Sequence, residues 1–162
     1  MKTSFNHFFK ISIIFLIGLS LTACMSLGQL SYKQARMLKK EGFTLTEEGW
    51  TLGLPERLLF EFDQSEVKEK QTGELVRLSR QLHQYKLQKL KVIGHTDSTG
   101  EANYNQQLSE KRAQTVAVVF ENNGFKPENI QAIGRGSSQP LFENDSEEHR
   151  ASNRRVNIII IP

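Results

Sequence analysis

The sequence predicts an α/β fold, a two-layer sandwich in which one sheet of four strands carries helices on one side. Segments with strand-like and with helical spacing of apolar residues alternate from residue 57 to residue 162, which is typical of this class. The last of these segments, "RVNIIII", is continuously apolar, as a strand at the centre of a sheet would be. A chain of 162 residues is long enough for one modest core of this kind.

Four segments are predicted strands, and two are predicted long helices. The first helix covers 69–85, where leucines recur at helical spacing. The second covers 105–123 and is followed by Gly124, a residue type that commonly ends a helix. The strands are "RLLFEFD" (57–63), "KLKVIGH" (89–95), "NIQAIGRG" (129–136) and "RVNIIII" (155–161).

The segments before residue 57 are predicted to precede this domain. Residues 1–23 have two lysines and no acid, then the apolar run "ISIIFLIGLSL", then small residues before Cys24, which is the layout of a signal peptide. A short transmembrane anchor is the alternative, although the run is shorter than the ~17 residues that a spanning helix needs. Residues 24–56 are predicted to be a tether with a short helix, ended by Gly42, and a small hairpin.

The charge of the chain argues against nucleic-acid binding. The whole chain has 21 basic and 18 acidic residues, and residues 1–23 hold two of the lysines. The remainder, with 19 basic and 18 acidic residues, is therefore close to neutral. No basic stripe interleaved with aromatic residues is present, so the sequence lacks the usual signature of a nucleic-acid partner.

The helix predicted at 105–123 carries a charged residue on its inward face. At about 100° per residue, one stripe of this helix contains Asn105, Leu108, Arg112, Val116 and Val119. A buried guanidinium keeps its proton and needs an anionic partner, either a protein carboxylate or a ligand. Asp97 lies in the loop before the helix. The spacing leaves two interpretations open: a structural salt bridge between Asp97 and Arg112, or a binding site.

Several catalytic and metal-binding patterns are missing from the sequence. His95 has no second histidine at ligand spacing, so a structural role at the end of its strand is favoured over a metal site. "GRGSSQP" lacks the ending of a phosphate loop, and no nucleophile elbow occurs. The acid pairs Glu47–Glu48 and Glu147–Glu148 are expected to be solvated loop residues. We therefore expect no enzyme activity, no cofactor and no metal.

Three motifs together resemble one known family. "GHTDSTGEANYNQQLSEKRAQTV" (94–116), "GRGSSQP" (134–140) and "NRRVNIII" (153–160) resemble the C-terminal domain of the OmpA family, and the resemblance covers residues 57–162. It implies that the sheet is mixed. It also implies non-covalent binding of peptidoglycan through the diaminopimelate of the stem peptide.

The same resemblance implies the residues of the site. Asp97 would hold the ammonium and Arg112 the carboxylate at one end of diaminopimelate, which suits their charges. Of the adjacent Arg154 and Arg155, Arg154 is placed in the site, while a structural role at the start of a strand stays open for both. The other residues that the resemblance places in the site are Thr96, Asn105, Phe62 and Asp63.

The end of the leader resembles a bacterial lipoprotein signal. "LTAC" at 21–24 is similar to a lipobox, which implies that Cys24, the only cysteine, is acylated and becomes the N-terminus. Several acyl chains would hold the protein on a membrane almost permanently. Met25 follows, not aspartate, and by resemblance this favours the outer membrane, with the domain facing the periplasm.

The segment "EGFTLTEEGWTLGLPERLLFEF" (41–62) resembles the region before the domain in the YfiB family of outer-membrane lipoproteins. In that family this region captures a periplasmic YfiR repressor, which frees the diguanylate cyclase YfiN to make cyclic di-GMP. The expected partner-binding residues are Phe43, Leu45 and Trp50, unless they simply pack on the domain. The alternatives are a plain peptidoglycan-associated lipoprotein and a peptidoglycan hydrolase. A homodimer is also left open.

Overall fold

A computed structural model describes residues 30–61 and 64–162, and residues 32–162 form one compact unit. The predicted signal peptide and Cys24 lie outside the described residues, as do Phe62 and Asp63. Within the described part, no helix is both long enough and apolar enough to cross a membrane.

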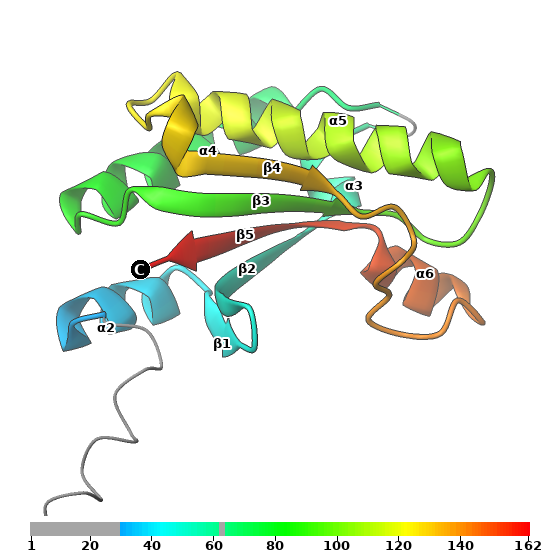
Figure 1. Cartoon of the computed structure of the whole chain (residues 1–162), viewed down its shortest axis with the longest axis horizontal. Helices are drawn as coiled ribbons and strands as arrows, with labels where there is room; N and C mark the ends of the chain where they lie inside the picture. Colours follow the sequence, from blue (N-terminus) through cyan, green and yellow to red (C-terminus); the bar gives the residue numbers. More distant parts are fainter. Residues whose placement is uncertain (1–29, 62–63) are drawn as a thin grey trace, which may run out of the picture. The chain divides into compact units, whose positions relative to one another are not determined.

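The compact unit is built on one mixed sheet of five strands, in the order β1-β2-β5-β3-β4 (Figure 1). Neighbouring strands are antiparallel except β3 and β4, which are parallel. The predicted α/β class with a mixed sheet is confirmed, although the sheet has five strands and not four. The strands are β1 (Thr44–Thr46), β2 (Gly49–Pro55), β3 (Lys89–His95), β4 (Ile130–Gly134) and β5 (Arg155–Ile161).

β5 is an inner strand, as its continuously apolar sequence predicts. It pairs with β2 on one side and with β3 on the other. Ile158, Ile159 and Ile160 are all buried. Because successive side chains of a strand point to opposite faces, both faces of β5 are covered.

The strand predicted at 57–63 is wrong. Glu56–Leu59 form a short helix, α3, and Phe60 makes only an isolated bridge to Val67. The place beside β5 is taken by β2, so the hairpin predicted within the tether is the edge of the sheet. The two segments have similar alternation of apolar residues, and pairing with β5 decides which of them becomes a strand.

Two long helices cover one face of the sheet (Figure 1). α4 (Glu69–Gln84) and α5 (Ala102–Glu121) confirm the predicted helices, except that α5 begins three residues earlier. Gly124 follows α5 with a left-handed φ of +99°, which suits a residue that ends a helix. The predicted inward leucines of α4 are buried; they are Leu75, Leu78 and Leu82.

Two glycines allow α5 to lie unusually close to the sheet. Gly94 of β3 pairs with Gly134 of β4 beneath the turn of α5 that contains Ser109. A Cβ on Gly94 would overlap the Ser109 carbonyl oxygen, and a Cβ on Gly134 would lie 2.6 Å from the backbone nitrogen of Glu110. This close approach fixes the position of the helix that carries Arg112.

The remaining helices are short. α2 (Tyr32–Lys40) is followed by Gly42 with a φ of +90°, as predicted, and a 3₁₀ turn (Pro127–Asn129) precedes β4. Glu147 and Glu148 were predicted to lie in a loop, but they begin a short helix, α6 (Glu147–Asn153). Ser146 caps α6 by accepting a hydrogen bond from the backbone N–H of His149, and acids in the first turn favour the helix.

Candidate functional site

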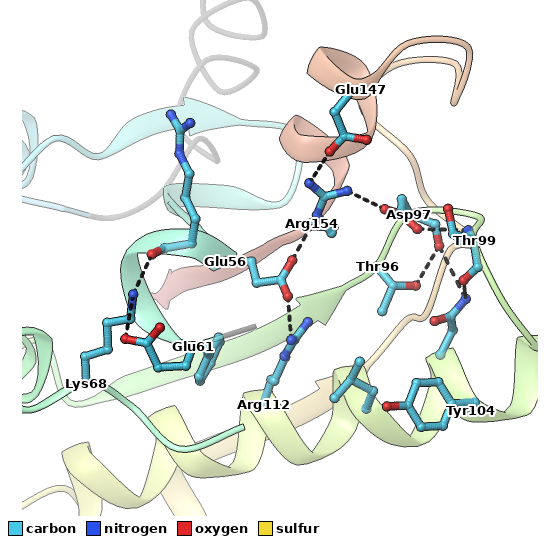
Figure 2. Close-up of a pocket in the computed structure, with 14 residues that line it drawn as sticks. Glu56, Glu61, Lys68, Thr96, Asp97, Thr99, Tyr104, Arg112, Glu147 and Arg154 are labelled. Atoms are coloured by element: carbon cyan, nitrogen blue, oxygen red, sulfur yellow. Dashed lines mark hydrogen bonds and ion pairs between the residues drawn. The ribbon is translucent and has the colours of Figure 1, made fainter. Parts of the chain in front are cut away.

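A cavity of about 570 Å³ lies where β2 and β3 end and β5 begins (Figure 2). Both β2 and β3 are antiparallel to β5, so the residues that follow them meet the residue that precedes β5 at one edge of the sheet. α5 closes the other side. Five residues that the resemblance places in the site line this cavity together: Thr96, Asp97, Asn105, Arg112 and Arg154.

Asp97, in the loop after β3, is a buried carboxylate with two hydrogen-bond donors. Its Oδ2 accepts a hydrogen bond from Arg154 Nη1 at 2.6 Å, and its Oδ1 accepts one from the backbone N–H of Thr99 at 2.8 Å. Burial alone would raise the pKa of Asp97. The bonds from Arg154 and Thr99 outweigh burial and hold the pKa below its usual 3.8. Asp97 is therefore ionised at neutral pH.

Asn105 and Thr96 hold the loop that carries Asp97. Asn105 Nδ2 donates to the carbonyl oxygens of Thr99, at 2.8 Å, and of Asp97, at 3.4 Å. Thr96 Oγ1 donates to the Asp97 carbonyl oxygen at 2.9 Å. The structure thus shows both side chains positioning the loop, and their direct contact with a ligand stays a prediction.

Arg112 lies in the middle of α5 and is only 2 % exposed. Its Nε donates to the Gln64 carbonyl oxygen at 3.1 Å, and its Nη2 lies 2.5 Å from Glu56 Oε1. Its Cζ lies 5.2 Å from the centre of the Phe60 ring, within cation–π range. The predicted need for an anionic partner is confirmed, and Glu56 is that partner.

Glu56 joins the two arginines of the cavity (Figure 2). Its Oε1 faces Arg112, and its Oε2 lies 3.1 Å from Arg154 Nε. Arg154 then pairs with Asp97 and, through Nη2 at 2.7 Å, with Glu147. Within the described residues, Asp97 and Arg112 form no direct salt bridge, so that interpretation is wrong. They are connected by alternating charges in the order Arg112–Glu56–Arg154–Asp97.

The two adjacent arginines point to different places. Arg154 faces the cavity, where its carboxylate partners raise its pKa although burial opposes them. Arg155 donates to the carbonyl oxygens of Asn153, at 3.1 Å, and of Gln139, at 3.2 Å. Arg154 is therefore the arginine that faces the site, while Arg155 ties the neighbouring loop to the start of β5.

His95, at the end of β3, is buried beside Arg155. Neither of its ring nitrogens has a hydrogen-bond partner within the described residues. Burial, and then the positive charges of Arg155 and Arg135, lower the pKa of His95 to about 3. The ring is therefore neutral at neutral pH, and its place in the strand agrees with the expected structural role.

Nine residues that line the cavity are absent from the predicted set, among them Glu56, Tyr104 and Glu147. The inward position of Arg112 required an acid, but nothing in the spacing indicated which one. Glu56 follows β2 directly, so recognition of β2 as a neighbour of β5 would have placed it beside Arg154. Tyr104, in the first turn of α5, is half exposed and lines the cavity.

The expected partner-binding residues lie together around a shallow hollow at the β1–β2 hairpin. Phe43 is 2 % exposed and Trp50 is 8 % exposed, whereas Leu45 is 50 % exposed. The two aromatic residues therefore pack on the domain in this structure, which is the alternative that the sequence left open. Leu45 is the one of the three with a large exposed side chain.

The family model that matches this chain is that of the OmpA family, over residues 59–154. The chain belongs to the OmpA family. The matched range contains every predicted residue of the cavity, from Thr96 to Arg154. It begins after Glu56, so this carboxylate comes from outside the part that the OmpA-family model covers.

The similarity of this OmpA-family chain to its relatives extends beyond residues 59–154. The chain is 35% identical to the outer-membrane lipoprotein YfiB of Pseudomonas aeruginosa, over 91% of this chain and 89% of the relative. It is 32% identical to YfiB of Escherichia coli (strain K12), over 88% and 91% of the two chains. A solved structure, the cell wall anchor of the T6SS from Pseudomonas aeruginosa, matches with a TM-score of 0.65 and 26% identity, over 85% of this chain and 100% of that one.

Proposed function

We propose that the chain is a lipoprotein of the outer membrane that binds peptidoglycan non-covalently, through the diaminopimelate of the stem peptide. The observation that carries the proposal is the placement of Arg112 and Asp97 in one cavity, each paired with a charge of opposite sign. The cavity volume falls within the ~300–1,000 Å³ of typical small-molecule sites.

The chemistry of diaminopimelate fits these two residues. Its free end is a carbon that bears both an ammonium and a carboxylate. Arg112, which lines the cavity, takes the carboxylate. Asp97 takes the ammonium. Hydrogen bonds to charged groups contribute about 1.5–3 kcal/mol each, so a ligand with only one of the two charges binds much more weakly.

The names of two similar proteins support a role at the envelope. One relative is named an outer-membrane lipoprotein, and one solved neighbour is described as a cell wall anchor. In this chain Cys24 would carry the lipid, with the folded unit facing the periplasm. The protein would then connect the outer membrane to the cell wall without catalysing a reaction.

Co-sedimentation with purified sacculi tests the wall-binding proposal. The full chain, purified in detergent, is expected to pellet with sacculi. Asp97→Ala and Arg112→Ala should each weaken binding by about 10–100-fold, the equivalent of the one charge-assisted hydrogen bond lost. Circular dichroism first establishes that each variant is folded.

Matched controls separate the site from charge in general. Asp145→Ala and Arg80→Ala remove the same residue types from exposed positions that do not line the cavity, and both should bind like the wild type. Equal loss in these controls, or no binding by the folded wild type, would contradict the proposal.

We further propose that the protein captures a periplasmic repressor of the YfiR type, which frees a YfiN-type diguanylate cyclase to make cyclic di-GMP. The support is that similarity to YfiB covers 91% of this chain, well beyond the OmpA-family match. Of the three hairpin residues, Leu45 offers the exposed contact, while Phe43 and Trp50 support the hollow beside it.

A single substitution tests repressor capture. Leu45→Asp should weaken binding of a purified YfiR-type repressor in a pull-down. Leu58→Asp, which changes an equally exposed leucine of α3, should not. If neither variant changes capture, or the wild type captures nothing, a plain peptidoglycan-associated lipoprotein is the better description. Fragments released from sacculi by the wild type would instead favour a hydrolase.

A further inference from the structure

Glu56 contacts both arginines of the cavity, although it precedes the range that matches the OmpA family. It reaches them because β2 ends at the same edge of the sheet as β3. In Figure 2 its carboxylate lies between Arg112 and Arg154. Glu56 is the first residue of α3 and directly follows the hairpin strand β2, which was predicted to be part of the tether.

The charges of the cavity balance because Glu56 is present. The inner cluster holds two guanidiniums, of Arg112 and Arg154, and two carboxylates, of Glu56 and Asp97. The other charged residues that line the cavity are Glu61, Glu147, Arg57 and Lys68, two of each sign. Without Glu56 the inner cluster would carry one net positive charge.

Glu56 neutralises Arg112 without engaging all of its donors. Nη2 of Arg112 pairs with Glu56 and Nε donates to the Gln64 carbonyl oxygen, so these described contacts leave Nη1 for a ligand. A ligand carboxylate can therefore bind Arg112 while Glu56 stays in place. That ligand then brings a negative charge into a cluster that is already neutral.

We propose that Glu56 is a specificity-determining residue of the wall site, because it makes the cavity accept a zwitterion and reject a plain anion. A zwitterion places its carboxylate on Arg112 and its ammonium near Asp97, so the total charge does not change. A plain anion faces the carboxylates of Glu56 and Asp97 with no ammonium to offset them. The inference rests on the proposed function, since it concerns the same cavity.

Two matched ligands test this inference. meso-Diaminopimelate and pimelate share one carbon chain, but pimelate lacks both amino groups. Isothermal titration of the full chain in detergent should show a strong preference for diaminopimelate. In Glu56→Gln the ratio of the two dissociation constants should fall by at least about tenfold, mainly because pimelate binds more tightly.

Two further variants show whether the charge of Glu56 is what matters. Glu147→Gln removes an exposed carboxylate from the same Arg154 and should keep the ratio within about threefold of the wild type. Glu56→Asp keeps the charge and should also retain most of the preference. A merely structural role for Glu56 predicts instead that Asp and Gln perturb the ratio equally, and that result would overturn the inference.

A variant that removes a positive charge tests the inference if Glu56→Gln does not fold. Arg154→Gln leaves the inner cluster with two carboxylates and one guanidinium, so the cavity should bind heptane-1,7-diamine more tightly than the wild type does. The inference is contradicted if Arg154→Gln does not bind the diamine more tightly, or if folded Glu56→Gln keeps the wild-type ratio. In that case, binding of the wild type to sacculi would still support the proposed function. Failure of the wild type to bind sacculi contradicts the proposed function itself.

Discussion

Glu56 Oε1 lies 2.5 Å from Arg112 Nη2, and the two side chains are only 16 % and 3 % exposed. The pair joins the start of α3, directly after β2, to the middle of α5, two elements far apart in the sequence. Glu56 makes the burial of Arg112 possible, because this guanidinium without Glu56 would be poorly solvated and would lack its ion-pair partner. The pair therefore stabilises the fold and is also a part of the site.

Removal of the carboxylate should destabilise the fold. Glu56→Ala leaves the guanidinium of Arg112 buried without a counter-charge, which should lower the free energy of unfolding by about 2–4 kcal/mol. Urea unfolding monitored by circular dichroism measures it. Glu147→Ala removes a carboxylate that is 67% exposed and should have a much smaller effect. Equal losses would mean that burial of the Glu56–Arg112 pair does not matter.

The lowered pKa of Asp97 predicts that the protein loses stability in acid. Its folded pKa lies below the usual 3.8, so its contribution is fully present above that pH and is lost as the pH falls through the folded pKa. The difference in unfolding free energy between the wild type and Asp97→Asn should therefore be constant at neutral pH and shrink below 3.8. Urea unfolding over a pH series measures it. A gap that widens in acid would contradict the depressed pKa.

Gly94→Ala should displace α5 from the sheet. The new Cβ would overlap the backbone carbonyl of Ser109, which cannot rotate away as a flexible side chain could. We expect a loss of about 3 kcal/mol or more in the free energy of unfolding, together with weaker sacculus binding, because α5 carries Arg112. Thermal unfolding and co-sedimentation measure the two effects.

The matched control for that variant is Gly73→Ala in α4. A Cβ there meets no atom within 4 Å, and alanine is the better helix former. This variant should be more stable than the wild type by about 0.5–1 kcal/mol. If both variants behave alike, close approach at Gly94 is not what the glycine provides.

The elements with strong local patterns were predictable from the sequence. α4 and α5 follow from helical spacing of leucines and from Gly124, and β5 follows from its apolar run. The identity of the strand that pairs with β5 on the side away from β3 was not predictable. Residues 57–63 and 49–55 both alternate, and the choice between them depends on pairing with β5, a contact about a hundred residues away in sequence.

The candidate site shows the same division. The inward position of Arg112 correctly required an anion, and the motif resemblance named four further residues that share its cavity. Glu56 could not be found that way, because its role depends on β2 and β3 ending at one edge of the sheet. A local pattern indicates that a charge needs a partner, while the topology decides which partner it has.

The lowered pKa of His95 predicts a second pH-dependent loss of stability, which begins at a less acidic pH. Burial and two nearby arginines lower its folded pKa from 6.5 to about 3, so the unfolded chain binds a proton here more readily than the folded one. Stability should therefore fall as the pH decreases below 6.5, by about 1.4 kcal/mol per pH unit for one proton. Between pH 6.5 and pH 5 the loss amounts to about 2 kcal/mol. His95→Gln should abolish it.

Two measurements check this assignment. Unfolding free energies at pH 6.5 and pH 5 should differ less in His95→Gln than in the wild type. The Cε1–H resonance of His95 in the folded protein should not titrate between pH 7 and pH 5, because both cationic neighbours, Arg155 and Arg135, disfavour the imidazolium. A midpoint near the ordinary histidine value would show that the ring is accessible to water.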